Sequence, residues 1–390
     1  MTMADGELAI AEAVFVQRAQ VAALPPPLAM RGVWGWLRAN LFSSWFNFWL
    51  TVFMLALLGW IAYALTEFLL LDAVWTGSDR NACLASEQHR DIGACWPFVW
   101  ERLNYFIYGS YPIPQRWRVD VFFAMLAIGV VWLLWLDAPR RDIGAFYFFI
   151  VLPTASFILL HGASVLGLAR VDTALWGGVL VTIVVAAVGI VVSLPLGILL
   201  ALGRRSRMPA VRLFSVIFIE FVRGVPLITV LFMASVMLPL FLSEDWSPDK
   251  LLRALIGIAL FASAYMAEVV RAGLLAIPRG QYEAATALGL RFWPRMRLII
   301  LPQALRVTIP NIVNTTIGLF KDTTLVFIVG IFDLLRTIEV ARIDPKWAAP
   351  VTSTTGYAVA AMFYFVFCYS MSRYARHMEL RLSTGGRGRR

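Results

Sequence analysis

The chain has 390 residues, of which 60% are hydrophobic and only 15% are charged, and its mean hydropathy is +0.75. Soluble domains carry about 25% charged residues, and a single soluble core stops growing near about 250–300 residues. These values exclude a soluble enzyme, a disordered chain and a disulfide-dense secreted module. The net charge of +10 is typical of basic loops beside anionic lipid headgroups. We expect no nucleic-acid partner, because no basic, aromatic-interleaved soluble segment is present.

Eight apolar segments are long enough to cross a hydrocarbon core of about 30 Å as helices. They are 48–71, 119–137, 143–161, 176–202, 213–242, 254–276, 307–331 and 356–372. The fifth is interrupted by Arg223-Gly-Val-Pro226 and the seventh by Lys321-Asp322. The pattern predicts an all-α integral membrane protein of about eight spans, preceded by a polar tail over 1–47.

The basic residues predict how these spans are oriented. With eight spans, both termini lie on one side, and the segments of that side hold 20 of the 34 lysines and arginines. The segments of the other side hold 11, spread over longer loops. Basic loops stay in the cytoplasm, so we expect a multi-pass protein of the bacterial inner membrane with both termini, the loop 277–306 and a basic tail over 379–390 in the cytoplasm.

Two cysteines lie in the longest external loop, 72–118. In a Gram-negative cell this loop would face an oxidising periplasm, and Cys83 and Cys95 are 12 positions apart. We predict a disulfide between them, contributing about 2–4 kcal/mol to local order. The alternative is two free thiols packed against the aromatic residues of the loop (Trp96, Phe98 and Trp100).

The loop between the sixth and seventh apolar segments has a distinctive sequence, running from Gly280 to Pro302. It predicts two short helices. Gly289 would end the first as a C-cap glycine, and Pro294 is suited to the first turn of the second. Taken alone, this pattern is that of an amphipathic hairpin on the membrane surface.

The same loop resembles the EAA loop of bacterial ABC importer permeases. The matching residues are Glu283, Ala284, Ala285, Gly289, Ile299, Leu301 and Pro302. The resemblance implies that this loop is the coupling helix, which docks into a groove on a cytoplasmic ATPase subunit. It also implies a five-helix permease core, here over 175–378, with the coupling loop over 277–302.

Three further segments resemble amino-acid permeases of this family. They are Phe221–Leu227, Ala264–Gly273 and Phe320–Leu325. Many relatives have glycine directly after the arginine at 271, whereas this chain has Ala272 followed by Gly273. The additional spans over 48–174, with the cysteine-bearing loop, are similar to the long permease of general L-amino-acid uptake systems.

The resemblance also implies the partners. The chain has no Gly-x-x-x-x-Gly-Lys-Ser/Thr phosphate loop, so ATP and Mg would be bound by two separate ATP-binding subunits. A second permease subunit, identical or a paralogue, would complete the pore, and a periplasmic binding protein would deliver the L-amino acid. We expect no catalytic residue, no metal and no cofactor on this chain.

Ionisable residues inside the spans are candidates for the translocation path, because such groups face a cavity or a partner. Glu220/Arg223 and Glu268/Arg271 are spaced i, i+3 and could simply neutralise each other. Asp322 or Thr323 could cap a half-helix whose N-terminus, with Thr324, faces a substrate carboxylate. The candidate path residues are Arg223, Glu268, Lys321, Asp322, Thr323 and Thr324.

A transporter or channel driven by an ion gradient, for amino acids or other small polar solutes, is the alternative. It explains broken helices and buried charges equally well. The spans show no evident inverted repeat, and this alternative leaves the EAA pattern unexplained.

Overall fold

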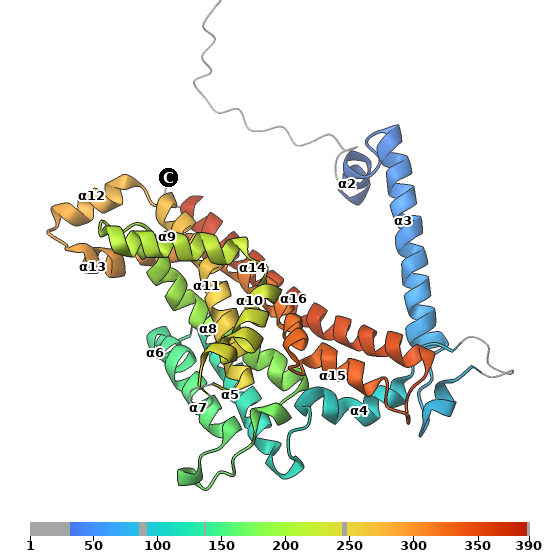
Figure 1. Cartoon of the computed structure of the whole chain (residues 1–390). Coiled ribbons are helices and arrows are strands. Elements are labelled where there is room, and N and C mark those ends of the chain that lie inside the picture. Colours follow the sequence, from blue (N-terminus) through green and yellow to red (C-terminus); the bar gives the residue numbers. More distant parts are fainter. Residues whose placement is uncertain (1–31, 86–91, 136–137, 244–247, 388–390) are drawn as a thin grey trace, which may run out of the picture. The chain divides into compact units, whose positions relative to one another are not determined.

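The computed structural model describes residues 32–85, 92–135, 138–243 and 248–387 (Figure 1). Of the predicted tails, 1–31 and 388–390 lie outside these residues. The described part is helical, with isolated backbone bridges and no strands. The helices are α2 (Gly32–Asn40), α3 (Trp45–Thr66), α4 (Trp96–Tyr108), α5 (Trp117–Leu134), α6 (Arg141–Phe146), α7 (Leu152–His161), α8 (Gly178–Arg204), α9 (Pro209–Gly224), α10 (Leu227–Phe232), α11 (Lys250–Ala276), α12 (Arg279–Ala287), α13 (Phe292–Arg295), α14 (Leu301–Asp322), α15 (Leu334–Ala341) and α16 (Pro350–Arg387).

Seven helical segments of the described chain are long and apolar enough to cross a membrane. An eighth crossing results if α9 and the segment Leu227–Phe241 are counted as one bent span. All eight predicted segments fall on these helices, so the prediction of an all-α membrane protein with about eight spans is confirmed. The signal was strong because each segment is a mostly apolar stretch of about 20 residues.

The fifth span is bent by 106° between α9 and Leu227–Phe241. Val225 is extended, with φ −106° and ψ 135°, and Pro226 precedes the first residue of α10. Proline lacks the N–H that a continuous helix needs, and it disfavours helical backbone in the residue before it. The predicted interruption at this proline is therefore present as a sharp corner.

The loop after α11 differs from the two short helices expected. The first is present as α12, and Gly289 follows it with φ +73°, the left-handed conformation that glycine adopts most easily. The second is not a separate short helix. Instead, α13, a π-helical turn (Met296–Ile300) and α14 follow one another without a break, so it is continuous with the next span. Pro302 directly follows the π-helical turn and does not interrupt the helix.

Packing divides the chain into two compact units, one ending at Leu70 and the other beginning at Leu71. The first contains α2 and α3, and the Ser44 side chain caps α3 by accepting a hydrogen bond from Asn47 N. The second contains all later helices. The proposed boundary between an extension ending at 174 and a core starting at 175 lies inside this second unit, so it remains a proposal from the resemblance.

Small residues let α8 and α11 pack closely at the centre of the second unit. A Cβ atom at Gly197 of α8 would lie 2.8 Å from Met266 Cβ on α11. Helices in lipid associate through such close contacts, because the bilayer offers apolar side chains no hydrophobic gain from pairing. The small buried residues of α11 include Ala254, Gly257, Ala259, Ala262, Ser263, Ala264 and Ala267.

The cysteine-bearing loop forms a small module with α15 and the start of α16. Cys83 and Cys95 are joined by a disulfide, with their Cα atoms 5.8 Å apart. Both are buried and pack in one cluster with Phe98 of α4 and Trp347. Cys95 N donates to Thr355 Oγ1 of α16 over 2.9 Å. The loop is therefore held on the C-terminal part of the chain.

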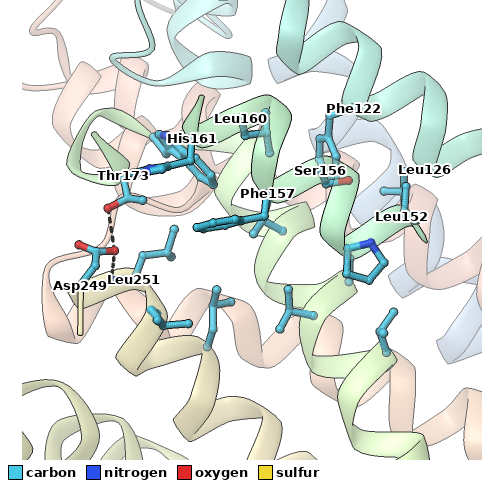
Figure 2. Close-up of a pocket in the computed structure, with 18 of the residues that line it drawn as sticks. Phe122, Leu126, Leu152, Ser156, Phe157, Leu160, His161, Thr173, Asp249 and Leu251 are labelled. Carbon is cyan, nitrogen blue, oxygen red and sulfur yellow. Dashed lines mark hydrogen bonds between the residues drawn. The ribbon is translucent and has the colours of Figure 1, made fainter. Parts of the chain in front are cut away.

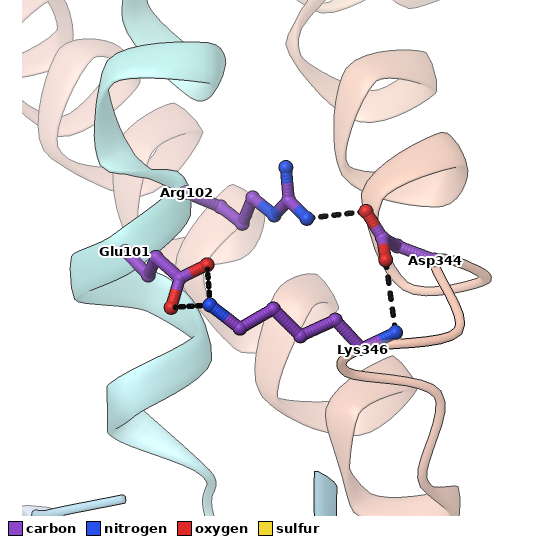
Figure 3. A network of polar contacts seen from close by, with 4 residues as sticks. All are labelled: Glu101, Arg102, Asp344 and Lys346. Carbon is purple, nitrogen blue, oxygen red and sulfur yellow. Dashed lines mark hydrogen bonds and ion pairs between the residues drawn. The ribbon is translucent and has the colours of Figure 1, made fainter. Parts of the chain in front are cut away.

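Charged residues at the edge of this module join α4 to the segment after α15 (Figure 3). Lys346 Nζ lies 2.6 Å and 2.7 Å from the two carboxylate oxygens of Glu101. This ammonium group holds the pKa of Glu101 below its usual value. Arg102 pairs with Asp344. These pairs are substantially exposed, so each contributes at most about 1 kcal/mol.

Asp333, before α15, carries a testable pH dependence. Its carboxylate caps α15 by accepting from Leu335 N and Arg336 N, yet burial raises its pKa to about 6. The unfolded carboxyl has a pKa near 3.9, so the folded state binds the proton more tightly. The resulting stabilisation is complete below about pH 4 and disappears as the pH rises through 6, a change of about 2–3 kcal/mol.

Asp333→Asn keeps a capping oxygen but has no carboxyl to titrate. We therefore expect the free energy of unfolding of this variant to lack the change that Asp333 causes between pH 4 and pH 6. SDS titration of the full chain between pH 4 and 7.5 measures it. Identical pH profiles for the variant and the parent protein would contradict the assignment.

Candidate functional site

The loop that resembles the EAA loop is anchored to both neighbouring spans through α12. Tyr282 Oη donates to Leu274 O near the end of α11, over 2.9 Å. Gln303 Nε2, near the start of α14, donates to Gln281 Oε1 over 3.2 Å. Ala285 is 1% exposed, so only a small side chain fits there. α12 is therefore tied directly to both α11 and α14.

Several residues of α12 and of the turn that follows it are exposed in the described structure. Glu283, Ala284 and Gly289 are exposed, and Leu288 is 75% exposed. In Figure 1, α12 and α13 lie together at the end of the second unit where α11 stops and α14 starts. An exposed carboxylate on a helix that is anchored to its neighbours, followed by an exposed leucine at its end, is suited to docking against another protein.

The other residues of the pattern belong to the helix that follows the loop. Ile299 lies in the π-helical turn, and Leu301 and Pro302 begin α14. Ile299 and Leu301 pack against a buried cluster that includes Met296, Ile300 and Leu274. The Ile-x-Leu-Pro part of the pattern thus seats the helix against α11, whereas the Glu-Ala-Ala part forms α12.

Position 272, where the chain departs from its relatives, is exposed. The tight position is the next one: a Cβ at Gly273 would lie 2.6 Å from Thr308 Cγ2 and 2.7 Å from Ala304 O, both on α14. Gly273 therefore provides the close contact between α11 and α14, and Ala272 leaves that contact undisturbed.

Glu268 is the centre of a charged cluster formed by α8, α9 and α11. Its Oε1 lies 2.7 Å from Arg204 Nη1, and its Oε2 lies 2.8 Å from Arg271 Nη2 and 3.8 Å from Arg223 Nη1. Arg204 also contacts Glu220 Oε1 at 2.8 Å. We name these five residues the Glu268 cluster. Three arginines and two glutamates give it a formal charge of +1.

The cluster differs in part from the predicted i, i+3 pairs. Glu268 and Arg271 do pair, but Glu220 pairs with Arg204 and Arg223 faces Glu268. Arg204 lies just beyond the apolar segment 176–202, so the sequence did not mark it as a residue of the cluster. It is the last residue of α8, and only the packing of three helices brings it to both glutamates.

The residues Lys321 to Thr324 are arranged differently from the prediction. Asp322 makes no side-chain capping bond to the 3-10 helix that begins at Thr323. Thr323 Oγ1 donates to Phe320 O and Thr324 Oγ1 to Lys321 O. The predicted cap of a new half-helix by Asp322 or Thr323 is therefore wrong, because the threonine hydroxyls bond to the carbonyls of the helix that ends there.

The two groups of candidate path residues lie at different depths. Glu268 is eight residues before the end of α11, about 12 Å from it. Thr323 is 22 residues beyond the start of α14, about 33 Å from it. Because α11 ends and α14 starts at the same loop, the Glu268 cluster is nearer to α12. Among the described residues no hydrogen bond or ion pair joins the two groups.

Comparison with known proteins gives a family for the chain. The family model described as the binding-protein-dependent transport system inner membrane component matches residues 193–384. The chain is 50% identical over 350 residues to the inner membrane amino-acid ABC transporter permease protein YhdY of Escherichia coli strain K12, covering 90% of this chain and 93% of that protein.

A second relative is similar over almost its whole length. The glutamate/glutamine/aspartate/asparagine transport system permease protein BztC of Rhodobacter capsulatus is 40% identical over 430 residues, covering 94% of this chain and 98% of that protein. The chain belongs to the family of binding-protein-dependent transport system inner membrane components, the membrane-spanning permeases of ABC transporters.

Proposed function

We propose that the chain translocates L-amino acids as one permease subunit of an ATP-driven importer of the inner membrane. The relatives that match nearly its full length are named as permeases for amino acids, which supports this substrate class. The arrangement of α12 is the observation that carries the proposal. It is anchored to α11 and α14, and it leaves Glu283 and, at its end, Leu288 exposed.

The partners follow from this arrangement. Two ATP-binding subunits would hold ATP and Mg and dock on α12 of this chain and of a second permease subunit. The excess of basic residues on one side supports placing α12 and both termini in the cytoplasm. A periplasmic binding protein would deliver the amino acid to the opposite face.

The Glu268 cluster is the better supported of the two candidate regions of the translocation path. Its charge of +1 suits the carboxylate of an amino acid, and groups of both signs suit a zwitterion. Arg223 is the most loosely held member, 3.8 Å from Glu268 and stacked over the Tyr265 ring at 5.6 Å. We propose that it contacts the substrate carboxylate. Lys321, Asp322, Thr323 and Thr324 remain candidates for a separate point along the path.

Glu283→Arg tests the function, because it reverses the charge on the exposed face of α12 without touching its anchors. In proteoliposomes that hold the full transporter, we expect amino-acid uptake and ATP hydrolysis stimulated by the binding protein to fall by at least about tenfold, equivalent to about 1.4 kcal/mol of coupling. Co-purification of the subunits checks that the complex is still formed.

Glu379→Arg is the matched control. It makes the same charge reversal at an exposed position near the end of α16, outside the loop, and should leave stimulated hydrolysis near the parental value. Normal coupling in Glu283→Arg would contradict the assigned role of α12. Uptake driven by an ion gradient without ATP would favour a secondary transporter instead.

A further inference from the structure

A cavity of about 680 Å³ lies between α5, α7, α8 and α11, within the second unit. Figure 2 shows side chains from these helices around it. Most of its wall is apolar. The lining includes Phe122, Leu126, Leu152, Leu160, Val188 and Val191. The cavity is separate from the Glu268 cluster and α12, since none of their residues lines it.

Three buried polar atoms belong to lining residues and lack a partner. They are Ser156 Oγ, His161 Nδ1 and Trp176 Nε1, and no described residue forms a hydrogen bond with any of them. Ser156 is 8% exposed and Trp176 is 5% exposed. Buried polar atoms are nearly always hydrogen-bonded, and the Trp176 indole can only donate. These three atoms have almost no accessible surface, so they lie within the wall of the cavity, and a ligand would be recognised by the other polar residues of the lining.

The polar lining residues are gathered at one end. His161 is the last residue of α7, Trp176 precedes α8, and Asp249 caps the start of α11. Arg170, Asp172 and Thr173 lie in the segment between α7 and α8. The end of α7 and the starts of α8 and α11 lie on one face of the bundle, opposite the loop that carries α12. The cavity therefore has a polar mouth at a membrane surface.

The depth of the cavity is that of one leaflet. Its lining on α7 runs from His161 at the mouth to Leu152, nine residues or about 14 Å of helix. Half of a hydrocarbon core of about 30 Å is about 15 Å. At the deep end Leu152 packs with Phe148 and Val191, which closes the cavity near the middle of the bilayer. An acyl chain of a single leaflet matches this length and lining.

The charges at the mouth suit a zwitterionic headgroup. Arg170 offers a cation, whereas Asp172 and Asp249 offer carboxylates. Thr173 Oγ1 donates to Asp249 Oδ2 over 2.7 Å (Figure 2), and Leu251 N donates to the same oxygen over 3.1 Å, which fixes this carboxylate at the mouth. A headgroup with a phosphate and a primary ammonium provides a partner for charges of both signs.

We propose that this cavity binds a phospholipid with a phosphoethanolamine headgroup, drawn from the leaflet opposite α12. One acyl chain fills the space between α5 and α7 on one side and α8 and α11 on the other. The headgroup phosphate lies at Arg170 and the ammonium group at Asp172 and Asp249. The lipid thereby joins α5 and α7 to α8 and α11, two of the helices that carry the Glu268 cluster.

The test uses the full-length chain with its co-purifying subunits in lipid nanodiscs. The probe is a phosphatidylethanolamine with a photoreactive group at the end of one acyl chain. Cross-linked residues are located by mass spectrometry. We expect labelling at the deep end of the cavity, at Leu126, Leu152 and Val191. Labelling confined to outward positions such as Val131, which is 57% exposed, would overturn the proposal.

Val188→Trp should fill the cavity and reduce the deep labelling severalfold. Val131→Trp, the same change on the outer face of α5, should leave it unchanged. Deep labelling that persists in Val188→Trp would show that the probe reaches these residues by another route, and would overturn the proposal.

Comparing probes with different headgroups tests the proposal without any substitution in the packed core. A phosphatidylglycerol probe with the same chains should label the deep residues several times more weakly, and Arg170→Gln, at an exposed position, should weaken labelling by both probes. Equal labelling by the two probes in the parent protein would overturn the assignment of a phosphoethanolamine headgroup.

Discussion

Glu268→Gln is expected to lower the free energy of unfolding by about 3–4 kcal/mol, because it removes the carboxylate shared by three arginines. Breaking a buried ion pair costs about 3–5 kcal/mol, as it leaves an uncompensated charge. Glu268 is 16% exposed and its partners 24–36%, so the lower half of that range applies. SDS titration of the purified chain measures this loss, and amino-acid uptake should fall with it.

Glu220→Gln is the matched control, since Glu220 contacts the same Arg204 at 2.8 Å but has a side chain that is 53% exposed. Exposed pairs contribute about 0–1 kcal/mol, and Arg204 keeps Glu268 as a partner. A small loss here beside a large one for Glu268→Gln would establish Glu268 as the centre of the cluster. Equal losses would contradict this arrangement.

Gly273→Leu is expected to cost more than about 3 kcal/mol, at the upper end of the range for overpacking. The first side-chain atom would already lie 2.7 Å from Ala304 O, a backbone atom that cannot move without displacing α14. Because α11 and α14 carry the anchors of α12, transport should be lost as well. Thermal unfolding of the detergent-solubilised chain and uptake in proteoliposomes give the two readouts.

Gly318→Leu provides the comparison in α14. Nothing lies within 4 Å of a Cβ atom built at Gly318, so the same change should leave stability near the parental value or raise it through the better helix propensity of leucine. A comparable loss in both variants would indicate that leucine is harmful in these helices for reasons other than the contact of Gly273 with α14.

The helices and their main interruption could be predicted from the sequence because their causes are local. Continuous apolar runs predict spans, and Pro226 acts on its own turn and the residue before it. Gly289 likewise ends α12 through its own backbone conformation. These features need no information about distant residues, so they appear in the structure where the sequence places them.

The candidate sites could be predicted only in part, because they depend on how helices pack. The i, i+3 rule identified Glu268 with Arg271 but assigned Glu220 and Arg223 to each other. The role of Thr323 was misjudged because its hydroxyl can bond either forward as a cap or backward to its own helix, and it bonds backward. The cavity beside α7 had no sequence signal, since four helices enclose it.

The module around the disulfide sets an order of events during synthesis. Cys83 and Cys95 are 12 residues apart, so their pairing needs no later part of the chain. Cys95 and Thr355, in contrast, are 260 residues apart, and Lys346 is 245 residues from Glu101. Domains of a growing chain fold from the N-terminus onward. The oxidised loop must therefore wait, with Phe98 uncovered, until the last span has been inserted, and a chain truncated before α15 would leave that surface open to proteases and chaperones.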